Sequence, residues 1–401
     1  MSGSVSTVPL EQLVDPGRPI TYGIVLPGPD VPNGVPYVRV VDIQEGTIRA
    51  EQLRRTTHEI AKSHKRSMLA TGDLVVSIRG HVGRTALVPS SADGANLTQD
   101  TARIAIRSDV DAQYVRWFIE SPVARQWMAQ HTKGVAVTGI NLGDLRKLPV
   151  PAVPLDEQHR IANVLDKADG VRRKRRETIA LYGQLLRSAF LEMFGDPVRN
   201  PRGWPVKALG ELADAQSGVA KGKRYAGQAM VTLPYMRVAN VQDGRIVLDE
   251  VKTIEVSEAE GLRYRLRAGD VLLTEGGDPD KLGRGAVWHG EIGDCIHQNH
   301  IFRVRPGPDI RSEFLSAIIA SERGKRYFLR AAKQTTGIAT INMTQLRAFP
   351  VLMPPLDRQN AYVRFIDRAR SVREKLRHHA DTVDGVFNSL VAGAFSREHA
   401  P

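Results

Sequence analysis

The sequence predicts an α/β protein built from two similar mixed α/β domains, each followed by a long helix. The segments LPVPAVPLDEQHRIANVLDKAD at 148–169 and FPVLMPPLDRQNAYVRFIDRA at 349–369 are nearly the same. Short apolar runs typical of strands alternate with stretches of helical periodicity in both halves of the chain. With 401 residues and 42% apolar content, the chain is long enough for more than one core.

The duplication covers most of the chain. PYVRVVDIQEGTI (36–48) matches PYMRVANVQDGRI (234–246), and GVAVTGINLGDLRKLPV (134–150) matches GIATINMTQLRAFPV (337–351), in the same order. Two copies of so long a period exclude a solenoid, whose units are short and stack in series. The predicted organisation is a domain at 1–152, a connector at 153–194, a second domain at 195–353 and a second connector at 354–401.

Within the first domain, the runs YVRVVDI, DLVVSIRG and TARIAI are predicted strands, and the apolar spacing of 112–131 predicts one helix. The second domain repeats this order with YMRVANV, DVLLTEGG, HIFRVR and a helical segment at 312–332. Each copy is therefore a mixed α/β domain.

Each connector is a predicted long helix. Pro154 suits a first helical turn, and the charges of Asp156 and Glu157 suit a helix N-terminus. Apolar residues then recur at heptad spacing in both connectors, so each helix has an apolar stripe that needs a partner. The other connector helix is the obvious partner. The alternative is that each helix lies on its own domain.

The charge of the chain favours a polyanionic partner. Its 56 basic and 44 acidic side chains give a formal net charge of +12, although a solvated basic surface would explain the same excess. Cys295 is the single cysteine, which excludes an intramolecular disulfide and suits a reducing, cytoplasmic location. The sequence contains neither an apolar run long enough for a membrane span nor a signal-peptide pattern, so no membrane partner is expected.

Motifs for catalysis are missing from the sequence. SGVAKGKR at 217–224 does not have the spacing of a phosphate-binding loop, and no Asn/Asp-Pro-Pro-Tyr tetrad for base methylation occurs. His297, His300 and Cys295 lack a fourth ligand at sensible spacing, so strand packing is favoured over a metal site. We therefore expect no catalytic and no metal-ligating residues, which disfavours a self-contained methyltransferase or nuclease.

The loops between predicted strands are rich in polar side chains beside glycines. Glycine allows close approach of backbone to phosphate, and Arg, Gln and Asn can pair with base edges. This content favours DNA binding over the alternative of a helical adaptor that binds only proteins. The basic run RRKRR at 172–176 is more typical of a solvated helix face. The candidate DNA-contact residues are Arg79, His81, Arg84, Gln99, Lys133, Thr138, Lys281, Arg284, Gln298, Asn299, His300, Lys333, Gln334 and Thr335.

The two connector motifs, together with LLRSAFLEMFGDP (185–197), GWPVKALGELADAQSG (203–218) and SLVAGAFSRE (389–398), resemble the specificity subunits of type I DNA restriction-modification systems. The resemblance extends over essentially the whole chain. It implies two target recognition domains that read the halves of a bipartite, asymmetric site in double-stranded DNA. It also implies that the connectors pack as an antiparallel coiled coil, which gives the internal repeat a pseudo-twofold axis.

The resemblance further implies partners and docking residues. Two modification (methyltransferase) subunits would dock on the helices at the repeated Pro-Leu-Asp-x-Gln motif, and restriction (motor endonuclease) subunits can join them. This chain would hold no cofactor, whereas S-adenosylmethionine, ATP and Mg would be bound by the partner subunits. Arg358 stands where the first copy has Glu157, which weakens the acidic start of the second helix. The docking residues are Asp156, Gln158, Asp357 and Gln359.

Overall fold

The computed structural model describes residues 6–134, 138–222, 227–277, 282–335 and 338–396. The chain divides into two compact units, each of which contains a globular domain and part of both long helices. Unit 1 is Met1–Glu177 with His378–Pro401, and unit 2 is Thr178–Arg377. Helix α5 (Leu155–Phe194) and helix α11 (Leu356–Phe395) match the two predicted connectors.

The centre of unit 1 is a four-stranded antiparallel sheet. Its strand order is β2-β10-β7-β8, and β7 is buried along its whole length. A second sheet has the order β6-β3-β9, and short pairs join β1 to β11 and β4 to β5. The strands are β1 (Thr7–Pro9), β2 (Thr21–Tyr22), β3 (Val35–Val38), β4 (Ile43–Gln44), β5 (Thr47–Ile48), β6 (Arg54–Thr56), β7 (Leu74–Ser77), β8 (Thr85–Leu87), β9 (Asn96–Leu97), β10 (Thr101–Ile104) and β11 (Pro149–Pro151).

The single helix predicted over 112–131 is wrong, because the segment forms two helices. Helix α2 (Ala112–Glu120) ends before Ser121, and α3 (Pro122–His131) begins at a proline, which cannot continue a preceding helix. The Ser121 hydroxyl caps α3 by accepting from the Ala124 amide at 3.3 Å. The remaining helices of this domain are α1 (His58–Ser63) and α4 (Leu142–Arg146).

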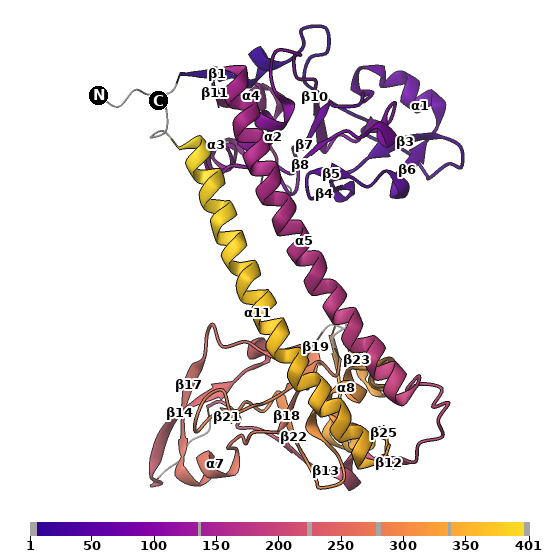
Figure 1. Ribbon diagram of the computed structural model, residues 1–401, viewed down its shortest axis with the longest axis vertical. Coiled ribbons are helices and arrows are strands. Elements are labelled where there is room, and N and C mark those ends of the chain that lie inside the picture. The colour runs from indigo at the N-terminus through magenta and orange to yellow at the C-terminus, as the bar shows by residue number, and fades with distance from the viewer. Residues whose placement is uncertain (1–5, 135–137, 223–226, 278–281, 336–337, 397–401) are drawn as a thin grey trace. The chain divides into compact units, whose positions relative to one another are not determined.

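The main core of unit 1 joins the sheet to both long helices. Trp117 of α2 packs edge-on against Phe387 of α11, with ring centroids 5.5 Å apart. Tyr114 and Phe118 each contact Phe395 in the same helix. Buried Leu165 of α5 belongs to the same core. In unit 1, the yellow end of α11 therefore packs beside the first half of α5 (Figure 1).

Unit 2 builds a sheet with the corresponding order, β13-β22-β18-β20. A second sheet is β17-β14-β21, a third is β19-β24-β23, and pairs join β12 to β25 and β15 to β16. The strands are β12 (Val206–Ala208), β13 (Ala213–Ser217), β14 (Met230–Met236), β15 (Val241–Gln242), β16 (Arg245–Ile246), β17 (Lys252–Ser257), β18 (Val271–Thr274), β19 (Gly276–Gly277), β20 (Gly285–Val287), β21 (Ile296–His297), β22 (Ile301–Pro306), β23 (Lys333–Thr335), β24 (Ile338–Thr340) and β25 (Pro350–Leu352).

The core of unit 2 also includes both long helices. Phe190 and Phe194 of α5 pack against Tyr362 of α11 and against Phe314 of α8 (Ser312–Ala320). The segment predicted as one helix is again two, and Gly324 lies so close to the preceding helix that a β-carbon would approach the Ile319 carbonyl oxygen at 1.8 Å. The helices are α6 (Leu209–Leu212), α7 (Glu258–Arg263), α8 (Ser312–Ala320), α9 (Glu322–Ala331) and α10 (Met343–Arg347).

The two long helices are amphipathic and not apolar all round. Among the residues that the structure describes, no helix is both long and apolar enough to cross a bilayer. Both units have mixed α/β structure, as the sequence predicts.

Candidate nucleic-acid interface

In unit 1, four of the predicted DNA-contact residues meet where β7 ends. The Arg79 guanidinium donates to Gln99 Oε1 at 2.9 Å and lies 3.8 Å from the Asp100 carboxylate. Backbone bonds hold the neighbouring loops: Gly80 N donates to Thr138 O at 3.0 Å, and Lys133 N to Gly139 O at 2.9 Å. The Arg79, Lys133 and Thr138 residues are exposed and Gln99 is half-buried. We name Arg79, Gln99, Asp100, Lys133 and Thr138 edge cluster 1.

His81 and Arg84 lie further along the loop between β7 and β8 that also contains Arg79. The Ser77 hydroxyl holds this loop, because it donates to the His81 carbonyl and accepts from the Arg84 amide at 2.8 Å. Gly83 turns the loop with φ +86°, and a β-carbon there would lie 2.8 Å from Met128 Cε. Arg84 borders a hollow of about 340 Å³ that also contains Gln44 and Arg116. Arg84 is exposed and available to a ligand in that hollow.

In unit 2, the corresponding edge lies where β18 ends. His300 Nδ1 is 2.6 Å from the Glu275 carboxylate oxygen Oε2, and Asn299 precedes His300 in the same turn. Lys333 of β23 is exposed, and its backbone pairs with Thr340 of β24. We name Glu275, Asn299, His300 and Lys333 edge cluster 2. It contains three predicted residues and Glu275, which was not predicted and whose carboxylate pairs with His300.

The other predicted DNA-contact residues of unit 2 lie in different surroundings. Arg284 donates to Gln242 Oε1 at 3.1 Å and borders a separate hollow of about 290 Å³. Gln298 is half-buried beside edge cluster 2, and its amide donates to Met236 O at 3.0 Å. The backbones of Gln334 and Thr335 lie in β23. Lys281 lies outside the described residues.

Glu275 could have been found from the sequence alone. The stretch DLVVSIRG matches DVLLTEGG, and this alignment places Glu275 opposite Ile78, an apolar residue in the first copy. A carboxylate that replaces an apolar residue directly after a buried strand is a signal of a specialised position. Glu275 is the negative side chain of a loop whose predicted DNA-contact residues are positive or carry amides.

The predicted docking residues divide into two kinds. Asp156 and Asp357 are exposed in the first turns of α5 and α11. Gln158 and Gln359 are buried, and their side chains bond within their own domains. Gln158 accepts from the Asp111 amide and donates to Val153 O, both at 2.9 Å. Each glutamine ties its helix to its own domain, which explains why the motif is repeated.

Gln359 makes the same kind of internal contact in unit 2. Its Oε1 accepts from the Arg311 amide at 2.9 Å, and its Nε2 donates to Pro354 O at 2.9 Å and to Asp309 O at 3.3 Å. The side chain is fully buried. Buried amides must satisfy both donor and acceptor groups, and here the backbone supplies the partners.

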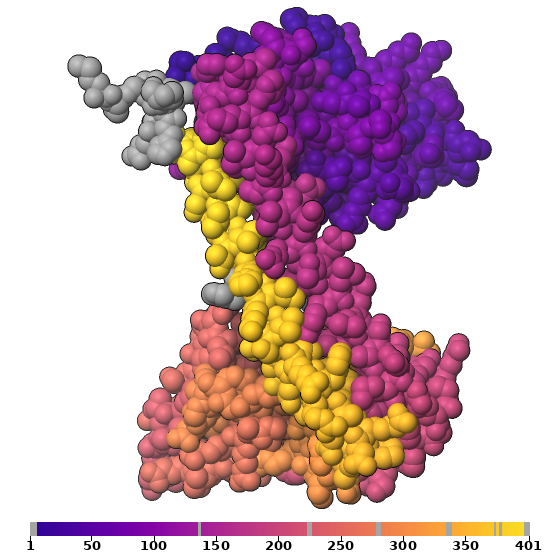
Figure 2. All heavy atoms as spheres, viewed as in Figure 1, coloured from indigo at the N-terminus to yellow at the C-terminus, as the bar shows by residue number. Residues whose placement is uncertain are grey.

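The basic run at 172–176 is partly neutralised within unit 1. Buried Asp169 pairs with Arg172 at 2.6 Å and with Arg173 at 3.0 Å. Arg176 is 3.4 Å from Asp384 of α11, and the Arg172 guanidinium stacks over the Phe387 ring at 4.0 Å. These arginines join α5 to α11. In Figure 2 the yellow end of α11 lies alongside α5.

His297 and Cys295 are core residues. Burial lowers the pKa of His297 to about 4 and raises the pKa of Cys295 to about 12. His297 Nδ1 lies 3.1 Å from the Tyr264 carbonyl oxygen and bonds to it, and the low pKa keeps the ring neutral near pH 7. Within the described ranges, no group of three or more His, Cys, Asp or Glu side chains could hold a metal ion.

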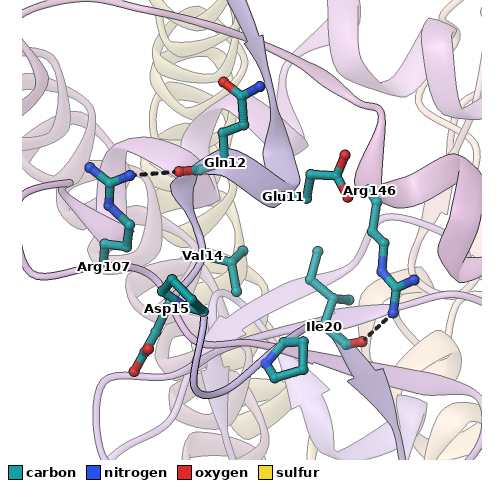
Figure 3. Close-up of a pocket in the computed structure, with 9 residues that line it drawn as sticks. Glu11, Gln12, Val14, Asp15, Ile20, Arg107 and Arg146 are labelled. Carbon is teal, nitrogen blue, oxygen red and sulfur yellow. Dashed lines mark hydrogen bonds between the residues drawn. The ribbon is translucent and has the colours of Figure 1, made fainter.

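A hollow of about 610 Å³ in unit 1 is lined by a different set of residues (Figure 3). Arg107 and Arg146 point to its walls, where they donate to the carbonyl oxygens of Gln12 at 2.9 Å and Ile20 at 3.1 Å. The hollow contains none of the predicted DNA-contact residues. Its two arginines therefore bond to backbone carbonyl oxygens of the same domain.

The sequence is similar to specificity proteins of type I restriction systems. Residues 29–180 match the type I restriction modification DNA specificity domain. The EcoBI specificity subunit of Escherichia coli is 30% identical over 190 residues, which are 46% of this chain and 40% of that subunit. The StySPI specificity subunit of Salmonella potsdam is 24% identical over 391 residues, 91% of this chain and 82% of that subunit.

The fold agrees with these sequence matches. The crystal structure of the type I restriction-modification S subunit from M. genitalium has a TM-score of 0.54 at 14% identity, with 98% of this chain and 96% of that chain covered. A second structure, solved for the complex assembly and conformational transition of the type I R-M system, has a TM-score of 0.55 at 17% identity and covers 98% of both chains. In sequence and in fold, the chain is therefore similar to the specificity subunits of type I restriction-modification systems.

Proposed function

We propose that this chain is the non-catalytic DNA-reading subunit of a type I restriction-modification complex, and that each unit reads one half of a bipartite, asymmetric target. The observation that carries the proposal is the pair of edge clusters. Both stand at the end of the corresponding strand, β7 or β18, and they hold different side chains. Two different surfaces on equivalent frames suit two different half-sites, whereas identical surfaces related by symmetry would suit a palindrome.

The long helices are proposed to form an antiparallel coiled coil that gives the repeat a pseudo-twofold relation. Reciprocal contacts support this arrangement. In unit 1, Arg172 of α5 stacks on Phe387 near the end of α11. In unit 2, Tyr182 of α5 donates to the Ala369 carbonyl in the first half of α11 at 2.5 Å. Early residues of one helix thus meet late residues of the other.

Docking of two modification subunits is proposed on the exposed faces of these helices. Asp156 and Asp357 are exposed at the two helix starts. Exposed large apolar side chains on a helix are typical of an interaction surface. Restriction subunits would join the complex, and the partners would bind S-adenosylmethionine, ATP and Mg. The exposed apolar residues are Val164, Val171, Val386 and Leu390 in unit 1, and Leu181, Leu185, Leu191 and Val372 in unit 2.

The decisive experiment is methylome sequencing of a host that lacks this system, with the modification subunit expressed alone or together with this chain. The expected result is one bipartite methylated motif that appears only when both proteins are present. Purified chain without partners should neither methylate nor cleave DNA. If the same motif is methylated without the chain, or if no motif appears although the complex assembles, the proposal fails and a protein-binding adaptor becomes the better account.

A further inference from the structure

The two edge clusters have the same backbone frame. In unit 1, Ile78 N donates to Asp100 O at 2.8 Å and Ile140 N donates to Ile78 O at 2.9 Å. In unit 2, Glu275 N donates to His300 O and Ile341 N donates to Glu275 O, both at 3.0 Å. Asp100 and His300 therefore occupy corresponding positions.

The neighbouring backbone bonds extend this correspondence. Gln99 N donates to Ile24 O, and Asn299 N donates to Val219 O, both at 2.9 Å. Lys133 is bridged to Gly139, and Lys333 pairs with Thr340, the residue that also pairs with Gly276. The frame is thus retained from β7 and β18 through to the last loop of each domain.

The charged side chains at this edge differ between the units: Glu275 occupies the position of Ile78, whereas Arg79 stands one residue later, at the position of Gly276. At the end of β7, edge cluster 1 presents the cation Arg79, with the anion Asp100 on the adjacent turn, 3.8 Å away. At the end of β18, edge cluster 2 presents the anion Glu275, with His300 on the adjacent turn, 2.6 Å away. The side chains of Arg79 and Glu275 are 49% and 33% exposed, so both can reach a ligand.

A cation at one edge and an anion at the other would suit different base edges. In the major groove, guanine presents the acceptors O6 and N7, which pair with arginine, whereas cytosine N4 and adenine N6 are donors. A carboxylate can only accept, and beside phosphates it is repelled unless a donor faces it. The hydrogen bond to His300 engages Oε2 of Glu275, and the other carboxylate oxygen has acceptor capacity for a base.

We propose that Arg79 and Glu275 determine specificity with opposite hydrogen-bonding character. Arg79, oriented by Gln99, donates to the O6 and N7 acceptors of guanine in one half-site. Glu275, oriented by His300, accepts from an exocyclic amino group, cytosine N4 or adenine N6, in the other half-site. This inference rests on the proposed function, because it assigns the chemistry by which each unit reads its own half.

The first test is the methylome of cells that express the modification subunit with the wild-type chain, Glu275→Gln or Glu255→Gln. The glutamine side chain has nearly the same shape as the glutamate it replaces, with an added donor. Glu255 is an exposed acidic residue of β17 in the same unit, so its variant removes the same charge elsewhere. The expected result for Glu275→Gln is a loss of discrimination of about 5- to 150-fold at one base pair of one half-site. Glu255→Gln should leave the motif unchanged.

The second test identifies the amino group with the purified complex. Synthetic duplexes would carry an analogue without the amino group, purine for adenine or 2-pyrimidinone for cytosine, at the relaxed base pair. For the base that Glu275 contacts, the analogue and Glu275→Ala should each reduce methylation, and together they should reduce it little further. The analogue that shows this non-additivity distinguishes adenine from cytosine.

The possible results distinguish a failure of the roles of Arg79 and Glu275 from a failure of the proposed function. A wild-type chain that directs no methylation overturns the proposed function. A normal wild-type motif that is unchanged in Glu275→Gln, or fully additive losses with both analogues, overturns only the role of Glu275. Arg79→Ala should relax a G·C pair in the other half-site alone, and an unchanged half-site would overturn the role of Arg79.

Discussion

Gln298 and Asn299 offer a direct residue-scale test of which unit reads which half-site. Both are half-buried in unit 2, next to His300, and their backbone amides hold the turn in place. Changing both to Ala keeps these backbone bonds and removes two amide side chains. Because a base-reading pair contributes about 1–3 kcal/mol of discrimination, the methylome should show one relaxed half-site.

The matched control in unit 1 is Gln99→Ala, at the position that corresponds to Asn299. This variant removes the 2.9 Å support of Arg79 and should relax the opposite half-site. Equal loss at both half-sites from the Gln298 and Asn299 variant would contradict the assignment and indicate general phosphate binding.

His297 makes the stability of unit 2 depend on pH. Its pKa is about 4 in the folded chain, because burial disfavours the charged ring, and about 6.5 in an unfolded chain. The unfolded state therefore binds the proton more readily. The stability contributed by the neutral ring is complete above about pH 6.5 and is lost as the pH falls towards 4, by about 3 kcal/mol.

Urea unfolding of unit 2, measured at pH 5 and pH 7.5, checks this dependence. Unit 1 provides the replacement, since Leu97 pairs with Val38 as His297 pairs with Met236. His297→Leu should flatten the difference between the two pH values, and exposed His58→Leu in unit 1 should not. A pH dependence that survives in His297→Leu would assign the effect to another group.

At the residue scale, the sequence predicted the exposed polar side chains better than their partners. Arg79, Gln99, Lys133 and Thr138 meet because the chain returns to the end of β7 in three separate loops. The buried glutamines of the connectors were not recognised, because a repeated exposed motif and a repeated buried hydrogen bond look the same in one sequence.

At the scale of elements, the repeated Asp-x-Gln motif combines two roles in one helix start. Gln359 is fully buried with three backbone partners, whereas Asp357 is exposed. Gln359→Leu would leave the Arg311 amide and two carbonyl oxygens without this partner, at a cost of about 1–3 kcal/mol in the unfolding free energy of unit 2.

Asp357→Asn should leave that unfolding free energy within about 0.5 kcal/mol of the wild-type value, because surface substitutions usually do. It should instead weaken capture of the modification subunit, which a pull-down of the assembled complex measures. If Gln359→Leu is as stable as the wild type, the buried glutamine is not the link between α11 and its domain.

The long helices were the most predictable elements, and their surroundings were the least. Heptad periodicity predicted both within a few residues of their observed bounds. It did not separate apolar residues that are buried from those that are exposed: Leu165 is in the core, whereas Val164 and Val171 are exposed. Periodicity marks a face of a helix, but the partners that cover this face lie far away in the sequence.

At the scale of the whole molecule, the helices are expected to set the gap between the half-sites. A heptad inserted into α5 alone, after Tyr182, would separate the contact of Tyr182 with Ala369 from that of Phe190 with Tyr362. Paired insertions avoid this conflict: one heptad between Glu177 and Thr178, and one between Arg377 and His378, where the two units divide.

Each helix would then lengthen by ~10 Å, about 3 bp of DNA rise. The half-site sequences should stay unchanged in the methylome while the unspecified gap widens. A matched variant with a heptad in one helix only should assemble poorly. If the paired variant assembles and methylates the original motif with the original gap, the helices do not set the spacing.

The pairing of β1 with β11, and of β12 with β25, has a consequence for how new specificities arise. Each domain is closed by a three-residue antiparallel pair, Thr7–Pro9 with Pro149–Pro151 and Val206–Ala208 with Pro350–Leu352, so the chain enters and leaves it side by side. Recombination between genes at these two seams would exchange an entire domain without changing the ends that the rest of the protein must accept. On the proposed function, a host could acquire a new DNA target in a single genetic event, and the proposed partner subunits would need no compensating mutation.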